Sequence, residues 1–137
     1  MALVRRLERS GGRYEVDELL GREWLVTNGL GGYASGSVAG VPTRRYHGVL
    51  VAALPGPLGR MVMLNHVGET LVDEEGGRVP LSTIELTGGL AEPEAPACLE
   101  EFAVEDGLPV WRFRHHDLVV EKRLLMPHRQ NTTHVFY

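Results

Sequence analysis

The chain has 137 residues, of which 43% are hydrophobic and 23% charged, and its formal net charge is −4. This length suits one domain, and the composition excludes a disordered chain. The negative charge excludes a general attraction to nucleic acid or to an anionic membrane surface. No run of residues approaches the roughly 18 apolar positions that a membrane span requires.

The single cysteine and the N-terminus both bear on location. Cys98 is the only cysteine, so no internal disulfide can form, and this favours a reducing compartment. Residues 1–4 form a short apolar stretch followed by Arg5 and Arg6, which is unlike a secretory signal peptide. We therefore expect a cytoplasmic protein.

The first quarter of the chain predicts short elements. Residues 2–7 are a candidate strand. Residues 16–20 suit one helical turn that ends at Gly21, a residue typical of helix C-termini. Residues 23–27 form an apolar strand. No stretch shows a sustained helical period, so we expect no long helix.

A glycine-rich bend follows this strand and organises the chain. Five glycines lie between Gly29 and Gly40, and an Asn-Gly pair opens the turn at residues 28–32. Small side chains then occupy residues 34–40. The polar cluster at 43–48 is the densest set of hydrogen-bonding side chains in the chain. Loops on a rigid scaffold often carry binding groups.

The rest of the chain predicts strands separated by turns. Residues 46–54 are almost continuously apolar, which is typical of a central strand buried on both faces. Residues 91–97 hold two prolines and suit a surface loop. Short strands at close spacing indicate one all-β domain over residues 1–137, an antiparallel β-sandwich. The further strands that we predict are 60–67, 69–72, 78–82, 83–90, 99–104, 110–115, 118–126 and 132–137.

Three kinds of chemistry find no support in the sequence. Gly29, Gly31 and Ala34 fit a loose dinucleotide fingerprint, but later glycines and Pro42 interrupt the helix that this motif needs, so we expect no cofactor. The six histidines lack cysteines at ligand spacing, so we expect no metal. The adjacent acids at 74–75 and 100–101 should point apart, so we predict no catalytic residue.

One polar set suits sugar recognition. Sugar hydroxyls are bound by amide, guanidinium and imidazole groups, with an aromatic ring against the apolar face of the pyranose. The structural alternative stays open: in it, these side chains set turns, pack, or dock on another domain. Trp24 and Trp111 suit the core better than a sugar platform. The candidate sugar-binding residues are Asn28, Tyr33, Arg44, Arg45, Tyr46 and His47.

Two stretches resemble a known family. Residues 23–36 read EWLVTNGLGGYASG and residues 43–48 read TRRYHG. Together they resemble the N-terminal domain of prokaryotic glycogen debranching enzymes of the amylo-α-1,6-glucosidase type. Shorter pieces at 99–102, 109–111, 121–122 and 131–133 fit in the same order. The resemblance therefore extends from about residue 23 to the end of the chain.

The resemblance implies a part of a larger glycoside hydrolase. It implies a supersandwich-like β-domain whose partners are an α-glucan such as glycogen and a C-terminal helical catalytic domain that carries the acid and base. The parent reaction would be hydrolysis of α-1,6-glucosidic branch linkages. Since those acids lie outside the chain, we expect the chain alone to be inactive.

Two alternatives remain. The chain is either a carbohydrate-binding module that works alone or a structural piece. Because the sequence stops within a predicted strand, we expect an incomplete sandwich with an open sheet edge. Either the missing part of the enzyme completes the sheet, or copies of the chain pair through that edge as a homo-oligomer.

Overall fold

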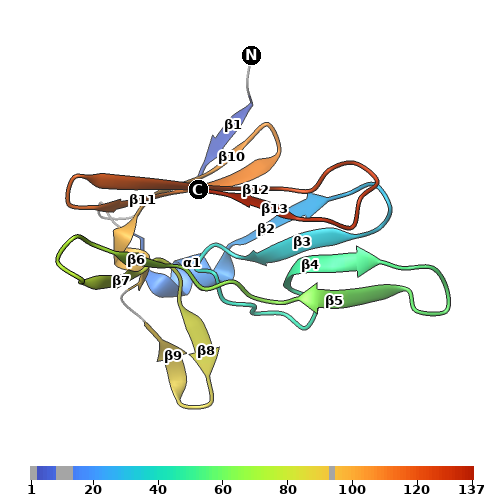
Figure 1. The fold of residues 1–137 in the computed structure, drawn as a ribbon, viewed down its shortest axis with the longest axis horizontal. Coiled ribbons are helices and arrows are strands. Elements are labelled where there is room, and N and C mark those ends of the chain that lie inside the picture. The colour runs from blue at the N-terminus through green and yellow to red at the C-terminus, as the bar shows by residue number, and fades with distance from the viewer. Residues whose placement is uncertain (1–2, 9–13, 93–94) are drawn as a thin grey trace.

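The computed structural model describes residues 3–8, 14–92 and 95–137, and these form an antiparallel all-β structure (Figure 1). Ala2, Pro93 and Glu94, which fall in predicted elements, lie outside the described residues. One sheet has the order β1–β10–β11–β12–β13, and its strands are Val4–Arg6, Leu99–Glu105, Leu108–His115, Leu118–Leu125 and His134–Phe136. A second sheet has the order β2–β3–β4–β5, and its strands are Glu23–Thr27, Tyr33–Ser37, Gly48–Ala53 and Arg60–Leu64.

Smaller elements complete the described chain. The helix α1 spans Val16–Gly21, and a 3-10 turn, η1, spans Ala95–Cys98. With six residues, α1 falls far short of a membrane span, and no other helix in the described ranges is long and apolar enough to cross one. The two-stranded hairpins β6–β7 and β8–β9 comprise Thr70–Val72 with Arg78–Pro80 and Ile84–Leu86 with Gly89–Ala91.

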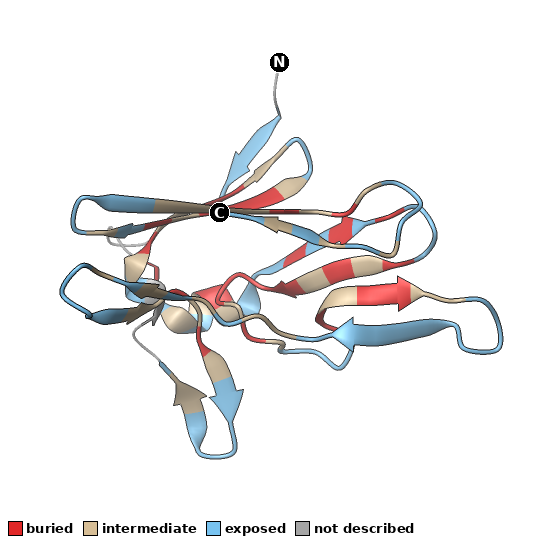
Figure 2. Cartoon of the chain, viewed as in Figure 1, coloured by how far each residue is buried: buried red, intermediate tan, exposed pale blue. Residues whose placement is uncertain are grey.

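The two large sheets share one hydrophobic core (Figure 2). Trp24 and Val26 are buried on β2, while Trp111 and Phe113 are buried on β11. The Trp24 and Trp111 rings meet edge to face, with centroids 5.4 Å apart. Each indole N–H donates to a backbone carbonyl, of Ser37 and of Val38 respectively, so neither polar edge is left unpaired.

This core confirms the assignment of both tryptophans to the interior. A cavity beside them has a volume of about 30 Å³, which is room for about one water molecule. It is too small for a sugar ring. The core of the sandwich therefore holds no sugar-sized cavity beside these rings.

Most predicted strands are confirmed, but the small-residue run after the bend is a strand that the sequence did not predict. β3 pairs with β2 along its whole length, with Trp24 opposite Gly36 and Val26 opposite Ala34. A Cβ built on Gly36 would lie 3.3 Å from the Trp24 ring. Small side chains on β3 thus make room for the indole of Trp24. Low strand propensity is outweighed here by tertiary packing.

Two further predictions need correction. Residues 83–90 form a hairpin instead of one strand, because Thr87 and Gly88 make a two-residue turn between β8 and β9. Gly21 is the last residue of α1, yet it is absent from the glycines with positive φ, so the left-handed ending expected of a C-terminal glycine is not used. The chain leaves the helix in extended conformation at Arg22.

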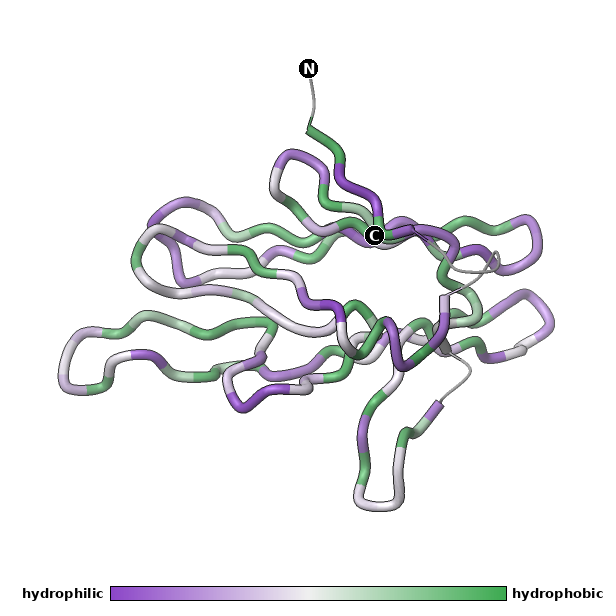
Figure 3. Tube along the Cα trace, turned by 180° about the vertical axis from the view of Figure 1, so that it is seen from behind, coloured by the Kyte–Doolittle hydropathy of each residue, from purple (hydrophilic) through white to green (hydrophobic). Residues whose placement is uncertain are grey.

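The strand β5 is apolar and yet exposed. The predicted strand at 60–67 ends at Leu64, and each residue from Arg60 to Leu64 is exposed. Figure 3 shows hydrophobic residues along both strands of the β4–β5 hairpin. β5 is an edge strand of its sheet, whereas β4 lies inside the sheet, as predicted for residues 46–54.

Candidate functional site

Asn28 holds the glycine-rich turn between β2 and β3. Its side-chain oxygen accepts hydrogen bonds from the backbone N–H of Leu30 (2.9 Å) and of Gly32 (3.0 Å). Its amide nitrogen donates to the carbonyl of Gln130 and to Oδ1 of Asn131, each at 3.0 Å. Asn28 is buried, and these four bonds use the full capacity of its amide. No donor or acceptor of this side chain is left for a ligand.

Asn131 is the residue that locks this turn to β4. Its Oδ1 accepts from the backbone N–H of Ala53 at 2.9 Å, and its Nδ2 donates to the carbonyl of Ala53 at 2.8 Å. The sequence marked residues 131–133 only through the family resemblance. Its bonding partners lie 78 and 103 positions away, so no local pattern predicts this role.

Gly32 explains why the bend needs glycine. A Cβ at this position would lie 2.6 Å from Nδ2 of Asn28 and 3.0 Å from the carbonyl oxygen of Val51. No side chain fits at such a distance, so the backbone approaches the Asn28–Asn131 pair only because the residue is glycine. The chain then enters β3 at Tyr33, and no helix begins here. The arrangement therefore lacks the helix that the dinucleotide motif requires.

His47 is buried and forms a closed set of hydrogen bonds. Its Nδ1 accepts from the backbone N–H of Thr43 (3.0 Å) and of Arg44 (3.3 Å). Because backbone amides only donate, the proton of the neutral ring lies on Nε2, which donates to Oε1 of Glu23 at 2.8 Å. Both ring nitrogens are thus occupied in fixing the loop after residue 43.

Glu23 joins this loop to β2. Its carboxylate also accepts from Nε of Arg44. The hydrogen bond from Arg44 is the main reason why the pKa of Glu23 lies below its usual value, although partial burial opposes the shift and His47 assists it. Arg44 and His47 therefore brace the loop, while the neighbouring Arg45 and Tyr46 project outward and are exposed.

A row of side chains crosses the outer face of the four-stranded sheet. Thr27 lies opposite Tyr33, Tyr33 opposite Val51, and Val51 opposite Val62. Directly opposed residues of antiparallel strands share a face. Since Val26 and Ala34, the neighbours of Thr27 and Tyr33, belong to the core, Thr27 and Tyr33 face outward, whereas Val51 is only 2% exposed.

Two adjoining depressions on this face share Tyr33 and Arg60 and together form what we call the Tyr33 groove. Arg60 lies opposite Ala53, two residues from Val62, so it belongs to the same face. Its guanidinium is 3.7 Å from the position that a Cβ on Gly31 would take. The first depression is lined by Tyr33, Arg45, Tyr46, Val51, Arg60 and Val62. The second is lined by Leu25, Thr27, Gly29, Gly31, Gly32, Tyr33 and Arg60.

Tyrosine and arginine side chains form the walls of the groove. The Tyr33 hydroxyl donates to the carbonyl of Tyr46 at 2.9 Å, which ties the 43–48 loop to β3. The Arg45 guanidinium lies 5.7 Å from the centroid of the Tyr46 ring, within the range of a cation–π contact. Of the six predicted residues, three line the groove (Tyr33, Arg45, Tyr46) and three hold its loops (Asn28, Arg44, His47).

Arg60 is a groove residue that the sequence did not indicate. It begins a strand of otherwise apolar residues and shows no motif. The only available signal was that a single charged residue precedes four hydrophobic ones. Its position opposite Ala53, and hence beside Tyr33, depends on the register of β4 with β5.

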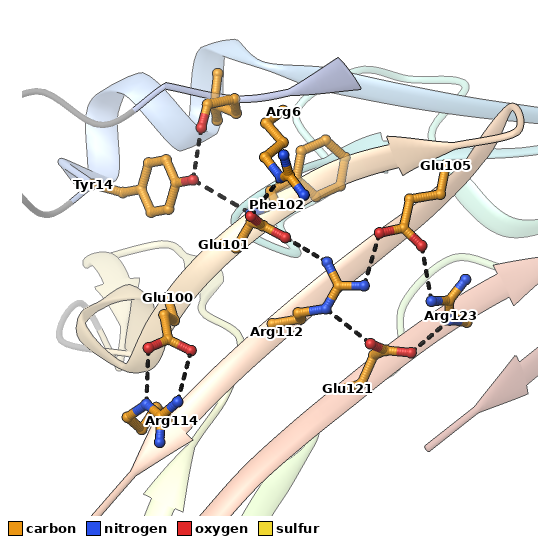
Figure 4. Close-up of polar contacts among 11 residues, drawn as sticks. Arg6, Tyr14, Glu100, Glu101, Phe102, Glu105, Arg112, Arg114, Glu121 and Arg123 are labelled. Carbon is orange, nitrogen blue, oxygen red and sulfur yellow. Dashed lines mark hydrogen bonds and ion pairs between the residues drawn. The ribbon is translucent and has the colours of Figure 1, made fainter. Parts of the chain in front are cut away.

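The acids of the five-stranded sheet form an ion-pair network on its outer face (Figure 4). Arg112 donates to Glu101, to Glu105 (2.7 Å) and to Glu121 (2.8 Å). Arg123 contacts Glu105 at 2.8 Å and also bonds Glu121. The network therefore ties β10, β11 and β12 together.

The prediction that Glu100 and Glu101 point apart is wrong. A register irregularity between Leu99 and Glu101 places both acids on the outer face, where Glu100 bonds Arg114 and Glu101 bonds Arg112. Arg112 and Arg114 are two residues apart on β11 and so share that face.

Two carboxylates of the network, Glu105 and Glu121, are unsuited to general acid catalysis. The hydrogen bond from Arg112 is the chief cause of a lowered pKa of Glu105, and the one from Arg123 of a lowered pKa of Glu121. Both stay ionised at neutral pH, whereas a glycosidase acid needs a raised pKa. Within the described ranges, no three His, Cys, Asp or Glu residues are placed to hold a metal ion.

Replacing Arg112 with methionine is expected to lower the free energy of unfolding at pH 7 by about 2 kcal/mol, because three carboxylates lose a charged hydrogen bond. Carboxylates with lowered folded-state pKa stabilise the fold above their usual pKa, about 4.3, and this contribution is lost as pH falls below it. The difference in unfolding free energy between wild type and variant, measured by urea unfolding, should therefore become smaller as the pH falls from 5 to 3. A difference that stays constant to pH 3 would contradict the network's role. Arg114→Met, which removes an exposed pair, is the control and should change little.

The geometry defines an all-β sandwich domain with a tyrosine- and arginine-lined groove on one outer sheet face. A family model described as "Glycogen debranching enzyme N terminal" matches residues 22–137. The chain therefore belongs to this family and is an N-terminal domain of a glycogen debranching enzyme, as the resemblance of residues 23–36 and 43–48 predicts. The comparisons with curated proteins and with solved structures gave no match.

Proposed function

We propose that this domain binds α-glucan for a glycogen debranching enzyme, using the Tyr33 groove. The observation that carries the proposal is the convergence of Tyr33, Arg45 and Tyr46 in one depression. Of the six predicted residues, these three would contact the sugar. The other three, Asn28, Arg44 and His47, hold the loops that carry them. Tyrosine rings present an apolar face with a polar edge, which suits a pyranose.

The loops that carry these side chains are fixed before any ligand arrives. The Glu23–His47 bond and the Asn28–Asn131 bond hold the two loops that form the groove walls. Pre-ordering of this kind lowers the entropic cost of binding. In this proposal Asn28, Arg44 and His47 act on the glucan only through the shape of the groove.

Bond cleavage belongs, in this proposal, to a catalytic domain elsewhere in the parent enzyme, which hydrolyses α-1,6 branch linkages in the cytoplasm. The domain itself, taken as one unit over residues 1–137, presents the glucan. Incubating the isolated chain with glycogen should release no glucose. Glucose release that is lost when an acid of this chain is mutated would overturn the assignment.

Titration of maltoheptaose by calorimetry tests the binding role. Tyr46 is 65% exposed, so its removal should not unfold the domain. We expect Tyr46→Ala to weaken binding about tenfold, which corresponds to about 1.4 kcal/mol. Phe136→Ala removes an exposed ring from β13, outside the groove, and should leave the affinity unchanged. Equal affinities for wild type and Tyr46→Ala, or no binding by wild type, would refute the role of the groove.

The exposed strand β5 supports a second candidate role, pairing between copies of the chain. Met61, Val62, Met63 and Leu64 are between 41% and 57% exposed on an edge strand, and such strands readily pair with another chain. Sedimentation over a hundredfold concentration range tests this role. Dimers that disappear in Met63→Lys would support it, and a monomer at all concentrations would exclude it.

A further inference from the structure

The Tyr33 groove differs from the rest of the molecule in its charge. It is lined by Arg45 and Arg60 and by no carboxylate, although the chain as a whole carries a net charge of −4. Elsewhere, Arg44, Arg112 and Arg123 are paired with glutamates. Within the part of the chain that the structure describes, neither groove arginine makes an ion pair.

The hydrogen-bonding capacity of the groove is also one-sided. Guanidinium groups only donate, and the side-chain acceptors in the groove are limited to the hydroxyls of Thr27, Tyr33 and Tyr46. A neutral sugar hydroxyl both donates and accepts, so a site built for it alone is expected to include carboxylates or amides. A phosphate monoester carries oxygens that accept from several donors at once, which matches two arginine forks.

Both guanidinium groups lie at the groove wall beside uncharged neighbours. Arg60 lies over Gly31, where the missing side chain leaves space for it, and Arg45 lies near the ring of Tyr46. Uncharged neighbours leave the charge of each arginine uncompensated. The groove thus offers two exposed cations next to the rings of Tyr33 and Tyr46.

We propose that the Tyr33 groove selects α-glucan that carries a phosphate monoester, with Arg45 and Arg60 binding the phosphate and the tyrosines contacting the adjoining glucose units. This inference rests on the proposed glucan-binding function and adds the charge of the preferred ligand. Charge-assisted hydrogen bonds from arginine to phosphate are roughly twice as strong as neutral ones.

The test compares three probes by calorimetry at fixed ionic strength: maltoheptaose, maltoheptaose bearing one phosphate monoester, and inorganic phosphate. We expect the phosphorylated sugar to bind at least about tenfold more tightly than the neutral one. Inorganic phosphate should compete with it, and added salt should reduce only the phosphorylated sugar's advantage. In the Arg45→Gln, Arg60→Gln double variant the advantage should disappear.

Arginine-to-lysine variants and a distant control keep the result interpretable. Arg45→Lys and Arg60→Lys retain the charge but lose the planar fork, so they should retain only part of the advantage. Arg78→Gln removes an exposed arginine from β7 and should change nothing. Circular dichroism of each variant confirms folding.

The outcomes separate this inference from the function on which it rests. If both sugars bind equally well, the phosphate preference is wrong and glucan binding stands. If the phosphorylated sugar is favoured equally in wild type and double variant, the site is wrong. If neither sugar binds, both proposals fail.

Discussion

Truncating Trp111 to alanine is expected to lower the free energy of unfolding by about 4 kcal/mol. Trp111 is 4% exposed, packs edge to face on Trp24 from the other sheet and lies 5.1 Å from the centroid of Phe102. Its removal leaves a cavity between the sheets and an unpaired carbonyl on Val38. Because stabilities of small domains are typically about 5–15 kcal/mol, the loss is a large part of the total.

Denaturant unfolding followed by circular dichroism measures this change. Leu118→Ala is the control, since Leu118 is 48% exposed on β12 and should cost less than about 0.5 kcal/mol. Similar costs for the two variants would mean that the Trp24–Trp111 contact does not join the sheets.

Replacing Asn28 with alanine is expected to cost about 3 kcal/mol, the second-largest effect. The change leaves the backbone N–H groups of Leu30 and Gly32 and the side chain of Asn131 without their partner in a buried setting. Asn131→Ala should have a comparable cost because it removes the bonds to Asn28 and to Ala53.

A double-mutant cycle tests whether Asn28 and Asn131 stabilise the fold through their mutual hydrogen bond or independently of each other. If Asn28 and Asn131 act together, the double variant should cost at least about 1 kcal/mol less than the sum of the single variants. Strict additivity would show that the two residues act independently. Asn65→Ala, at an exposed asparagine, is the matched control and should be close to neutral.

Much of the fold follows from local patterns in the sequence. The strand predicted at residues 110–115 and the assignment of Trp111 to the core are both confirmed in β11, where the buried Trp111 and Phe113 alternate with arginines. The Asn-Gly pair likewise predicts the turn after β2. These features depend on residues close together in the chain, so periodicity and turn chemistry are sufficient to find them.

The features that were missed depend on long-range contacts. β3 has weak strand propensity and is a strand because its small residues accommodate the Trp24 ring. Arg60 reaches the groove only through the register of β5, and Asn131 acts on a turn about one hundred residues earlier. The bulge that brings Glu100 and Glu101 to one face has no composition signal. In each case the deciding partner is distant in sequence.

The tie between Asn28 and residues 130–131 also has a consequence for biosynthesis. A chain is made from its N-terminus, so the β2–β3 turn leaves the ribosome long before Gln130 and Asn131, which lie 102 and 103 positions later. Until those residues emerge, the nascent turn lacks two of the four bonds made by the Asn28 amide. The loops around the Tyr33 groove should therefore be among the last parts of the domain to reach their final structure. A chaperone would be most useful to the nascent chain during this interval.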